Sequence, residues 1–280
     1  MKRKRTYFKG KTKANEKPLS PARIKYLKNQ KNVKTAIFLS RWLILIAFFV
    51  LWELLAKTGA IDAFLFSSPT RILNTLKNLS ASGDLAKHIF TTLFETVAGF
   101  AAATAIGTVT AMLLWWFQPL KKTLEPYIIV LNALPKIALG PVIIIAFGSG
   151  VKSIIFMTII VTVIVTIINM LNAYEQTEKG KILLLKSLGA NKLTVLFRLV
   201  VPSSAPAFFS TLKVNVGLSW IGSIMGEYIV SRQGLGYLIV YGGQVLNLDL
   251  VMTSTILLCV LAALMYLCVI LAEKLLLSRR

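Results

Sequence analysis

The stretch LVMTSTILLCVLAALMYLCVILA, residues 250–272, contains no aspartate, glutamate, lysine or arginine. A helix needs about 20 apolar residues to cross the hydrocarbon core of a bilayer, and it satisfies its own backbone hydrogen bonds there. Residues 97–117 and 154–171 form two further uncharged runs. Composition agrees, since 56% of the 280 residues are hydrophobic, 15% are charged and the mean hydropathy is +0.71. We therefore expect an all-α integral membrane protein.

Three more spans are predicted in segments that carry an ionisable residue or a proline. Arg41 and Glu53 lie near the ends of the first span, where long side chains can reach the water interface. The third span contains Pro135 and is expected to be kinked or broken. The fifth carries Lys213 and Glu227. The predicted fold has six transmembrane helices, at about residues 36–55, 90–117, 127–147, 154–171, 207–230 and 250–272.

Lysine and arginine are distributed unevenly between the two sides of these spans. If the N-terminus is inside, residues 1–41, 118–126, 172–203 and 273–280 are cytoplasmic, and they hold 24 of the 32 basic residues. Cytoplasmic loops of membrane proteins carry such an excess of Lys and Arg. We therefore expect both termini to be cytoplasmic.

The first 34 residues form a tail with 13 Lys and Arg and no apolar periodicity. This composition predicts a disordered segment at residues 1–34, followed by a membrane domain at 35–280. A polybasic stretch beside a membrane span is attracted to anionic lipid by about 1 kcal/mol per basic residue. We therefore expect membrane lipid rather than nucleic acid as its partner. The next apolar run is longer than that of a signal peptide and is expected to remain as a span.

The connection between the fourth and fifth spans is too long and too patterned to be a simple turn. Charged residues are interspersed with Ile and Leu between residues 175 and 188, which predicts an amphipathic helix. Gly189 follows, and glycine can adopt the left-handed conformation that ends a helix. A second short helix over residues 192–201 is expected to stop at Pro202. We call residues 175–202 the elbow. The pattern alone fits helices lying flat on a membrane equally well.

The elbow resembles the cytoplasmic signature of the permease subunits of ABC importers. In that signature a Glu-Ala-Ala helix is followed by Gly and, at a fixed distance, by Pro, and Gly189 precedes Pro202 by that spacing. The Glu-Ala-Ala positions hold Leu183, Leu184 and Leu185, so the carboxylate of the signature is absent. The resemblance implies that the elbow inserts into a cleft on a separate ATPase subunit. The residues it implies for this coupling are Leu185, Lys186, Ser187, Leu188, Gly189, Ala190 and Pro202.

Further segments between residues 45 and 275 are similar to the sulfonate, taurine and nitrate branch of these permeases. They are SSPT at 67–70, TL at 92–93 with GF at 99–100, ALPKIA at 133–138, and GE at 226–227 with GLGYL at 234–238. The resemblance implies a permease in the bacterial cytoplasmic membrane for an aliphatic sulfonate, taurine, nitrate or a similar small anion. It also implies ABC ATPase subunits, an extracytoplasmic substrate-binding protein, and a second permease, either a second copy of this chain in a homodimer or a paralogue, as partners.

Polar residues within the predicted spans are candidates for a translocation path. In the fifth span, Asn215, Ser219 and Ser223 recur every four residues and therefore share a helix face. The candidate path residues are Asn132, Lys136, Asn215, Ser219, Ser223 and Glu227. Such residues are equally suited to helix–helix packing, and both interpretations stay open. Lys213 and Glu227 lie about 21 Å apart along one helix and should not touch.

The sequence predicts no catalytic residue, cofactor or metal site. The Gly-Lys-Thr at residues 10–12 lacks the earlier glycine of a phosphate-binding loop, because position 5 is Arg5. His88 is the one histidine and is expected to be solvated in an outer connection. ATP hydrolysis is therefore expected in a partner subunit. Two other hypotheses remain: a self-contained secondary transporter or channel, and a membrane-bound enzyme or scaffold.

Overall fold

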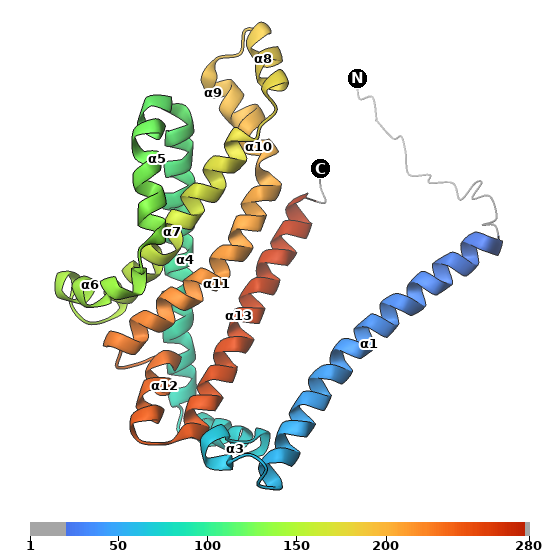
Figure 1. The fold of residues 1–280 in the computed structure, drawn as a ribbon, viewed down its shortest axis with the longest axis vertical. Coiled ribbons are helices and arrows are strands. Elements are labelled where there is room, and N and C mark those ends of the chain that lie inside the picture. Colours follow the sequence, from blue (N-terminus) through green and yellow to red (C-terminus); the bar gives the residue numbers. More distant parts are fainter. Residues whose placement is uncertain (1–20, 278–280) are drawn as a thin grey trace, which may run out of the picture. The chain divides into compact units, whose positions relative to one another are not determined.

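The fold is that of a computed structural model, which describes residues 21–277. All regular elements in this range are helical, which confirms the predicted all-α class (Figure 1). The chain divides into two compact units, Met1–Ala60 and Ile61–Arg280. Residues 1–20 of the predicted tail lie outside the described range.

The first unit contributes the helix α1 (Pro21–Lys57). Its segment Asn32–Lys57 is long and apolar enough to cross a membrane, in agreement with the first predicted span. The helix begins well before residue 35, so residues 21–34 are helical where the sequence predicts disorder. Pro21 suits the first turn of a helix, and Ala, Arg, Lys, Leu and Gln, which have high helix propensity, are frequent after it.

The second unit contains three single helices that are long and apolar enough to cross a membrane. They are α4 (Asp84–Trp116), α7 (Val151–Glu175) and α13 (Leu248–Leu277). Two bent pairs of helical segments also qualify. If each bent pair is one span, the described residues have up to six spans, the number that the sequence predicts.

The first bent pair matches the third predicted span, which the sequence expects to be kinked or broken. Helix α5 (Gln118–Ala133) is followed by η1 (Lys136–Leu139) and α6 (Gly140–Phe147), with an angle of 89° at the break. Pro135 explains the break, because the residue before a proline is pushed out of the helical region, and Leu134 is extended with ψ 140°.

The second bent pair consists of Lys192–Ser203, from the second half of the elbow, and α11 (Ala205–Val230), with an angle of 59° between them. The helical segments of the elbow after the end of α7 are α8 (Lys179–Ser187), α9 (Lys192–Val195), the π-helical turn η2 (Leu196–Val200) and α10 (Val201–Ser203), whose last residue lies just beyond it. It protrudes at one end of the second unit, which we call the elbow end (Figure 1).

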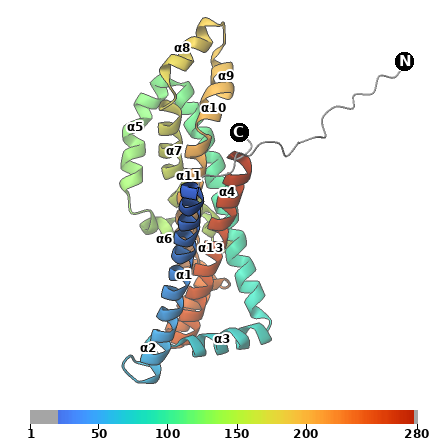
Figure 2. The same ribbon diagram turned by 90° about the vertical axis from the view of Figure 1, so that its right-hand side faces the viewer.

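The opposite end of the second unit carries three short helices. They are α2 (Ala63–Phe66), α3 (Pro69–Ala81) and α12 (Leu235–Gln244). Figure 2 shows α3 lying across the direction of α4 and α13. The guanidinium of Arg71 and the hydroxyl of Ser67 fix α3 to the start of α13, since both bond Asp249, at 2.8 Å and 2.6 Å respectively.

Helices α4, α7 and α11 pack together in the centre of the second unit (Figures 1 and 2). Glycines allow the close approach. A Cβ at Gly99 of α4 would lie 2.5 Å from the Thr158 side chain, and one at Gly222 of α11 would lie 2.7 Å from the Thr158 Cα. Small residues bring the backbones of membrane helices together in this way.

Candidate functional site

The elbow turns at Gly189. Its φ is +83°, so the glycine takes the left-handed conformation that the sequence predicts. The amide of Gly189 donates to the carbonyl of Lys186 at 2.9 Å, and that of Ala190 donates to Leu185 at 3.0 Å. These bonds form a Schellman motif, which satisfies the last carbonyls of α8. Asn191 then caps α9, since its side chain accepts the Thr194 amide at 2.8 Å.

The second half of the elbow differs from its prediction at Pro202. The helical segment does not stop there but continues to Ser203, and the bend follows at Ser204. Pro202 lies in α10, near the end of a helical run that is continuous from Lys192 to Ser203. The π-turn η2 precedes it, and such turns change the direction of a helix.

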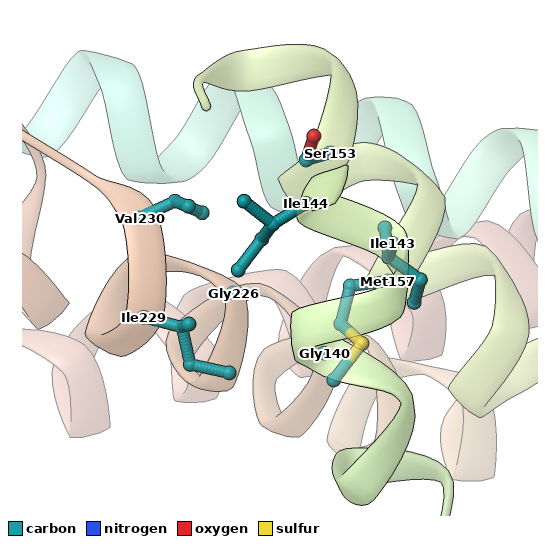
Figure 3. A pocket seen from close by; sticks show the side chains of 8 residues that line it. All are labelled: Gly140, Ile143, Ile144, Ser153, Met157, Gly226, Ile229 and Val230. Atoms are coloured by element: carbon teal, nitrogen blue, oxygen red, sulfur yellow. The ribbon is translucent and has the colours of Figure 1, made fainter. Parts of the chain in front are cut away.

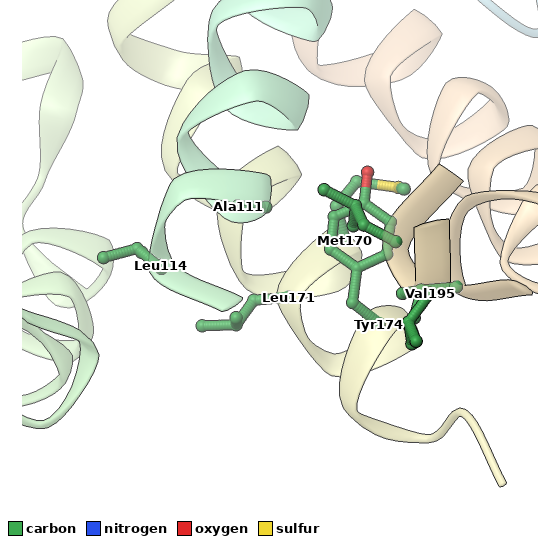
Figure 4. Close-up of a cluster of buried hydrophobic side chains, with 8 residues drawn as sticks. Ala111, Leu114, Met170, Leu171, Tyr174 and Val195 are labelled. Atoms are coloured by element: carbon green, nitrogen blue, oxygen red, sulfur yellow. The ribbon is translucent and has the colours of Figure 1, made fainter. Parts of the chain in front are cut away.

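A hydrophobic cluster fastens the elbow to α4 and α7 (Figure 4). Val195, Leu196 and Val200 of the elbow are buried in it. Its members from the long helices are Ala111 and Leu114 of α4, and Met170, Leu171 and Tyr174 of α7. Ile182, Leu185 and Ala190 pack against its edge. The elbow is therefore continuous with the packed core of the second unit.

Two polar contacts lie at the base of the elbow. The ammonium of Lys192 donates to the carbonyl of Trp116 at the end of α4 and lies 4.8 Å from the centre of its ring. Lys121 of α5 pairs with Glu175 at the end of α7 at 2.5 Å.

The outer face of the elbow is apolar and uncovered. Leu183, Leu184 and Leu188 are 67%, 60% and 74% exposed. They alternate with Ile182 and Leu185, which face the cluster. An exposed group of large apolar side chains is typical of a surface that contacts another protein or a membrane.

Two grooves separate α7 from α11 at the elbow end. The first, of about 330 Å³, is lined by Asn169, Asn172, Ala173, Gln176, Ala207, Ser210, Thr211 and Val214. The second, of about 420 Å³, shares Ala173, Gln176 and Ala207 with the first and adds Glu178 and Lys181 of the elbow. The grooves therefore adjoin each other, and the elbow forms part of the wall of the second one.

The polar face of α11 points into the packed helix core. The Asn215 amide donates to Thr104 of α4 at 3.0 Å and to Thr166 of α7 at 2.9 Å. The hydroxyls of Ser219 and Thr162 lie 3.4 Å apart. Ser223 bonds Thr96 at 2.7 Å. The three α11 residues share one face, as expected, and in this chain their polar atoms bind threonines of α4 and α7.

Asn132 and Lys136 lie apart from that face, on α5 and η1. The Lys136 ammonium donates to the side-chain oxygen of Asn132 at 3.2 Å. Lys213 pairs with Glu273 of α13 at 2.7 Å. This pair joins α11 to α13 and agrees with the expectation that Lys213 does not touch Glu227.

A pocket beneath α6 is too small for a solute (Figure 3). Its volume is about 10 Å³, close to the lower limit for one water molecule. It is lined by Gly140, Ile143, Ile144, Ser153, Met157, Gly226, Ile229 and Val230. These side chains pack α6 onto α7 and α11.

The opposite end holds a pair of carboxyl groups that the sequence analysis missed. Glu227 of α11 lies beside Glu95 of α4, close to the point where Ser223 and Thr96 of the same two helices bond each other at 2.7 Å, and each glutamate is 1% exposed. Glu95 occurs at the head of an apolar run, and an ionisable residue in such a place indicates a functional site. That signal could have identified it.

His88 also differs from its prediction. It belongs to α4 and is half-buried, rather than solvated in a connection. Its Nδ1 accepts the Gly234 amide at 3.0 Å, and its ring stacks on Tyr237 at 6.1 Å.

Comparisons with known proteins give the family. The family model for binding-protein-dependent transport system inner membrane components matches residues 103–280. The formylaminopyrimidine transport permease ThiX of Halalkalibacterium halodurans is 29% identical, over 67% of this chain and 74% of its own. The Escherichia coli protein SsuC, named for transport of aliphatic sulfonates, is 24% identical, over 77% of this chain and 82% of its own. The riboflavin transport permease RibX of Chloroflexus aurantiacus is 26% identical, over 81% of this chain and 85% of its own.

Solved structures show the same fold. A chain of the inward-facing MetNI methionine ABC transporter matches with a TM-score of 0.61 and 19% identity, over 68% of this chain and 94% of that one. A second crystal form of MetNI gives a TM-score of 0.62. Because the family model covers more than half of the sequence, the chain belongs to the binding-protein-dependent transport system inner membrane components, the permeases of ABC transporters.

Proposed function

We propose that this chain is the permease subunit of an ABC importer, powered by ATP hydrolysed in separate ATPase subunits. The observation that carries the proposal is the elbow. Its inner residues belong to the core cluster, whereas Leu183, Leu184 and Leu188 are exposed beside the Gly189 turn. This arrangement suits a rigid projection with a free apolar face that docks into an ATPase.

A movement of the docked elbow would act on the two grooves between α7 and α11. Glu178 and Lys181 of the elbow line the second groove, and Gln176 lines both. Amide and hydroxyl groups dominate the polar lining of the first groove, which suits the passage of a small polar solute. We infer that these grooves form the cytoplasmic mouth of the translocation path. The predicted path residues of α11 lie deeper, and Asn132 and Lys136 lie on the broken span.

The proposed orientation puts the elbow end and the C-terminus of α13 in the cytoplasm. The opposite end, with α3 and α12, then faces the extracytoplasmic binding protein. Helices α5 and α6 carry exposed apolar side chains, among them Ile129, Val142 and Ile145. This face is suited to a second copy of the permease, and we propose a homodimer.

We propose a small anion as the transported solute, namely an aliphatic sulfonate, taurine or nitrate. The similarity to SsuC supports this class. The test measures uptake into liposomes that contain the permease with the ATPase and binding protein encoded beside it. Uptake of a sulfonate, taurine or nitrate, and none of riboflavin, is expected. Uptake of riboflavin or formylaminopyrimidine alone would contradict the anion proposal and leave the importer proposal intact.

The importer proposal is tested by purifying the ATPase through a tag on the permease. Leu188→Asp puts a charge on the exposed face of the elbow and should abolish copurification and solute-stimulated ATP hydrolysis. Leu246→Asp is the matched control, because Leu246 is 65% exposed at the opposite end. The control should copurify with the ATPase as the wild type does. Copurification of the ATPase with both variants would contradict the docking role, and uptake by the permease alone would favour a secondary transporter.

A further inference from the structure

Glu95 and Glu227 form a buried contact between two acidic side chains. Oε2 of Glu227 accepts the Gly236 amide at 2.5 Å. The other oxygen, Oε1, and Oε2 of Glu95 are buried and have no donor among the described residues. Two ionised carboxylates repel each other and cannot supply a donor, so a hydrogen bond between them requires a proton.

Three consecutive amides at the start of α12 bind to this region. Gly236 donates to Glu227, Leu235 donates to the Thr92 hydroxyl at 2.7 Å, and Gly234 donates to His88 at 3.0 Å. Thr92 and His88 belong to α4, whereas Glu227 belongs to α11. The start of α12 is thus held by both long helices, and its amides offer positive charge to one carboxylate.

The backbone of this turn leaves room for the carboxyl group and for little else. A Cβ at Gly234, whose φ is +113°, would lie 2.5 Å from Cδ of Glu227. A Cβ at Gly236 would lie 2.7 Å from its Oε2. The two glycines therefore allow the backbone to close around Glu227.

We propose that Glu95 and Glu227 share one proton, and that this pair is a latch that holds α12 against α4 and α11. With one proton, Glu95 donates to Glu227, and Glu227 keeps its negative charge towards the α12 amides. Without it, two adjacent negative charges repel each other, and the turn at Gly234 is released. Glu95 is thus a positioning residue for Glu227. The role of the latch in transport rests on the proposed function, whereas the shared proton does not.

Other titratable groups face the pair from the surrounding elements. They are Tyr228, the residue after Glu227 on α11, and the stacked rings of His88 of α4 and Tyr237 of α12 at the turn that binds Glu227. Nδ1 of His88 lies 3.0 Å from the Gly234 amide, from which it accepts when neutral, and 3.2 Å from the Gly234 carbonyl, to which it would donate when protonated. His88 can therefore bond Gly234 in either protonation state. The latch is therefore expected to loosen at alkaline pH, when the shared proton is lost.

The shared proton is tested by infrared spectroscopy of the purified protein in lipid at neutral pH. A protonated carboxylic acid has a carbonyl stretch that a carboxylate lacks. The wild type should show this band, and Glu95→Gln and Glu227→Gln should each remove it, because the amide then supplies the donor. Glu125→Gln is the control, since the Glu125 side chain is 51% exposed, and it should leave the band unchanged. A wild type without the band, or a band that survives both variants, would overturn the proposal.

The positioning role is tested by hydrogen exchange at residues 234–236 and by uptake. In Glu95→Ala, exchange should rise about tenfold, the effect expected for one lost buried hydrogen bond. In Glu95→Gln, exchange should be as slow as in the wild type at neutral pH. The faster exchange that the wild type shows at alkaline pH should be absent from this variant. If the latch acts in transport, uptake should be reduced in Glu95→Ala and close to that of the wild type in Glu95→Gln. Slow exchange in Glu95→Ala would overturn the latch, whereas changed exchange with unchanged uptake would remove only its role in transport.

Discussion

Single residues decide how closely the central helices of this protein approach each other. Gly222 faces the Thr158 backbone of α7, and a Cβ there would lie 2.7 Å from the Thr158 Cα. Gly217 lies on the same helix, and a Cβ there would have no neighbour within 4 Å. Alanine substitutions at these two positions therefore separate the helix propensity of alanine from the effect of a steric clash.

Gly222→Ala is expected to destabilise the protein by about 1–3 kcal/mol, because backbone must move to make room for the methyl group. Gly217→Ala is expected to stabilise it by about 0.5–1 kcal/mol, since alanine favours a helix over glycine. Thermal unfolding in detergent compares the two variants. Equal melting temperatures would contradict the tight contact between α7 and α11.

At the scale of residues, the sequence predicts the left-handed Gly189 and the polar face of α11, because both depend on local spacing. It does not predict the partner of Glu227. Glu95 lies 132 positions earlier in the chain, and only the packing of α4 on α11 brings the two together. Contacts between distant helices cannot be read from the periodicity of either helix.

At the scale of elements, ion pairs tie the outer helices to the central three. The pair between Lys213 and Glu273 joins α11 to α13 at 2.7 Å, and its side chains are 29% and 24% exposed. A pair with this exposure is only partly screened by water.

Lys213→Glu should lower the free energy of unfolding by about 1 kcal/mol, because two partly exposed carboxylates then face each other. Adding Glu273→Lys reverses the pair and should recover most of that loss. A double-mutant cycle of unfolding measurements gives the coupling energy. A double variant that is no more stable than Lys213→Glu would show that the pair does not join the two helices.

The helices themselves were largely predictable, and their ends were not. Uncharged apolar runs locate α4, α7 and α13, because the bilayer requires such runs. The 89° break after Ala133 follows from Pro135, but its angle depends on how α6 packs onto α7 and α11. Pro202 permits either a stop or a short continuation of the helical run, and burial of Val200 and Leu196 in the core cluster selects the continuation.

At the scale of the whole molecule, the proposed topology puts the two ends of the second unit on opposite sides of the membrane. Leu188 and Leu246 are both exposed, one at each end. Single cysteines at these positions report the side that each end faces. The natural Cys259 and Cys268 are replaced by alanine first, because both are free and exposed in the structure.

A membrane-impermeant maleimide should label Leu246→Cys in cells that have lost the outer membrane or cell wall but keep an intact cytoplasmic membrane. It should label Leu188→Cys only in inverted vesicles, because the elbow then faces the medium. Labelling of both positions from the same side would contradict a membrane between the two ends. Labelling of Leu188→Cys alone in cells would reverse the orientation.

The alternation of inward and outward side chains along α8 has a consequence for how such permeases diverge. Ile182 and Leu185 are constrained by the core, whereas Leu183, Leu184 and Leu188 are largely uncovered by the part of the chain that the structure describes. After gene duplication, mutations could accumulate in the outward set without cost to folding. If this face docks an ATPase, as proposed, descendants of one permease acquire different ATPases through changes at a handful of leucine positions.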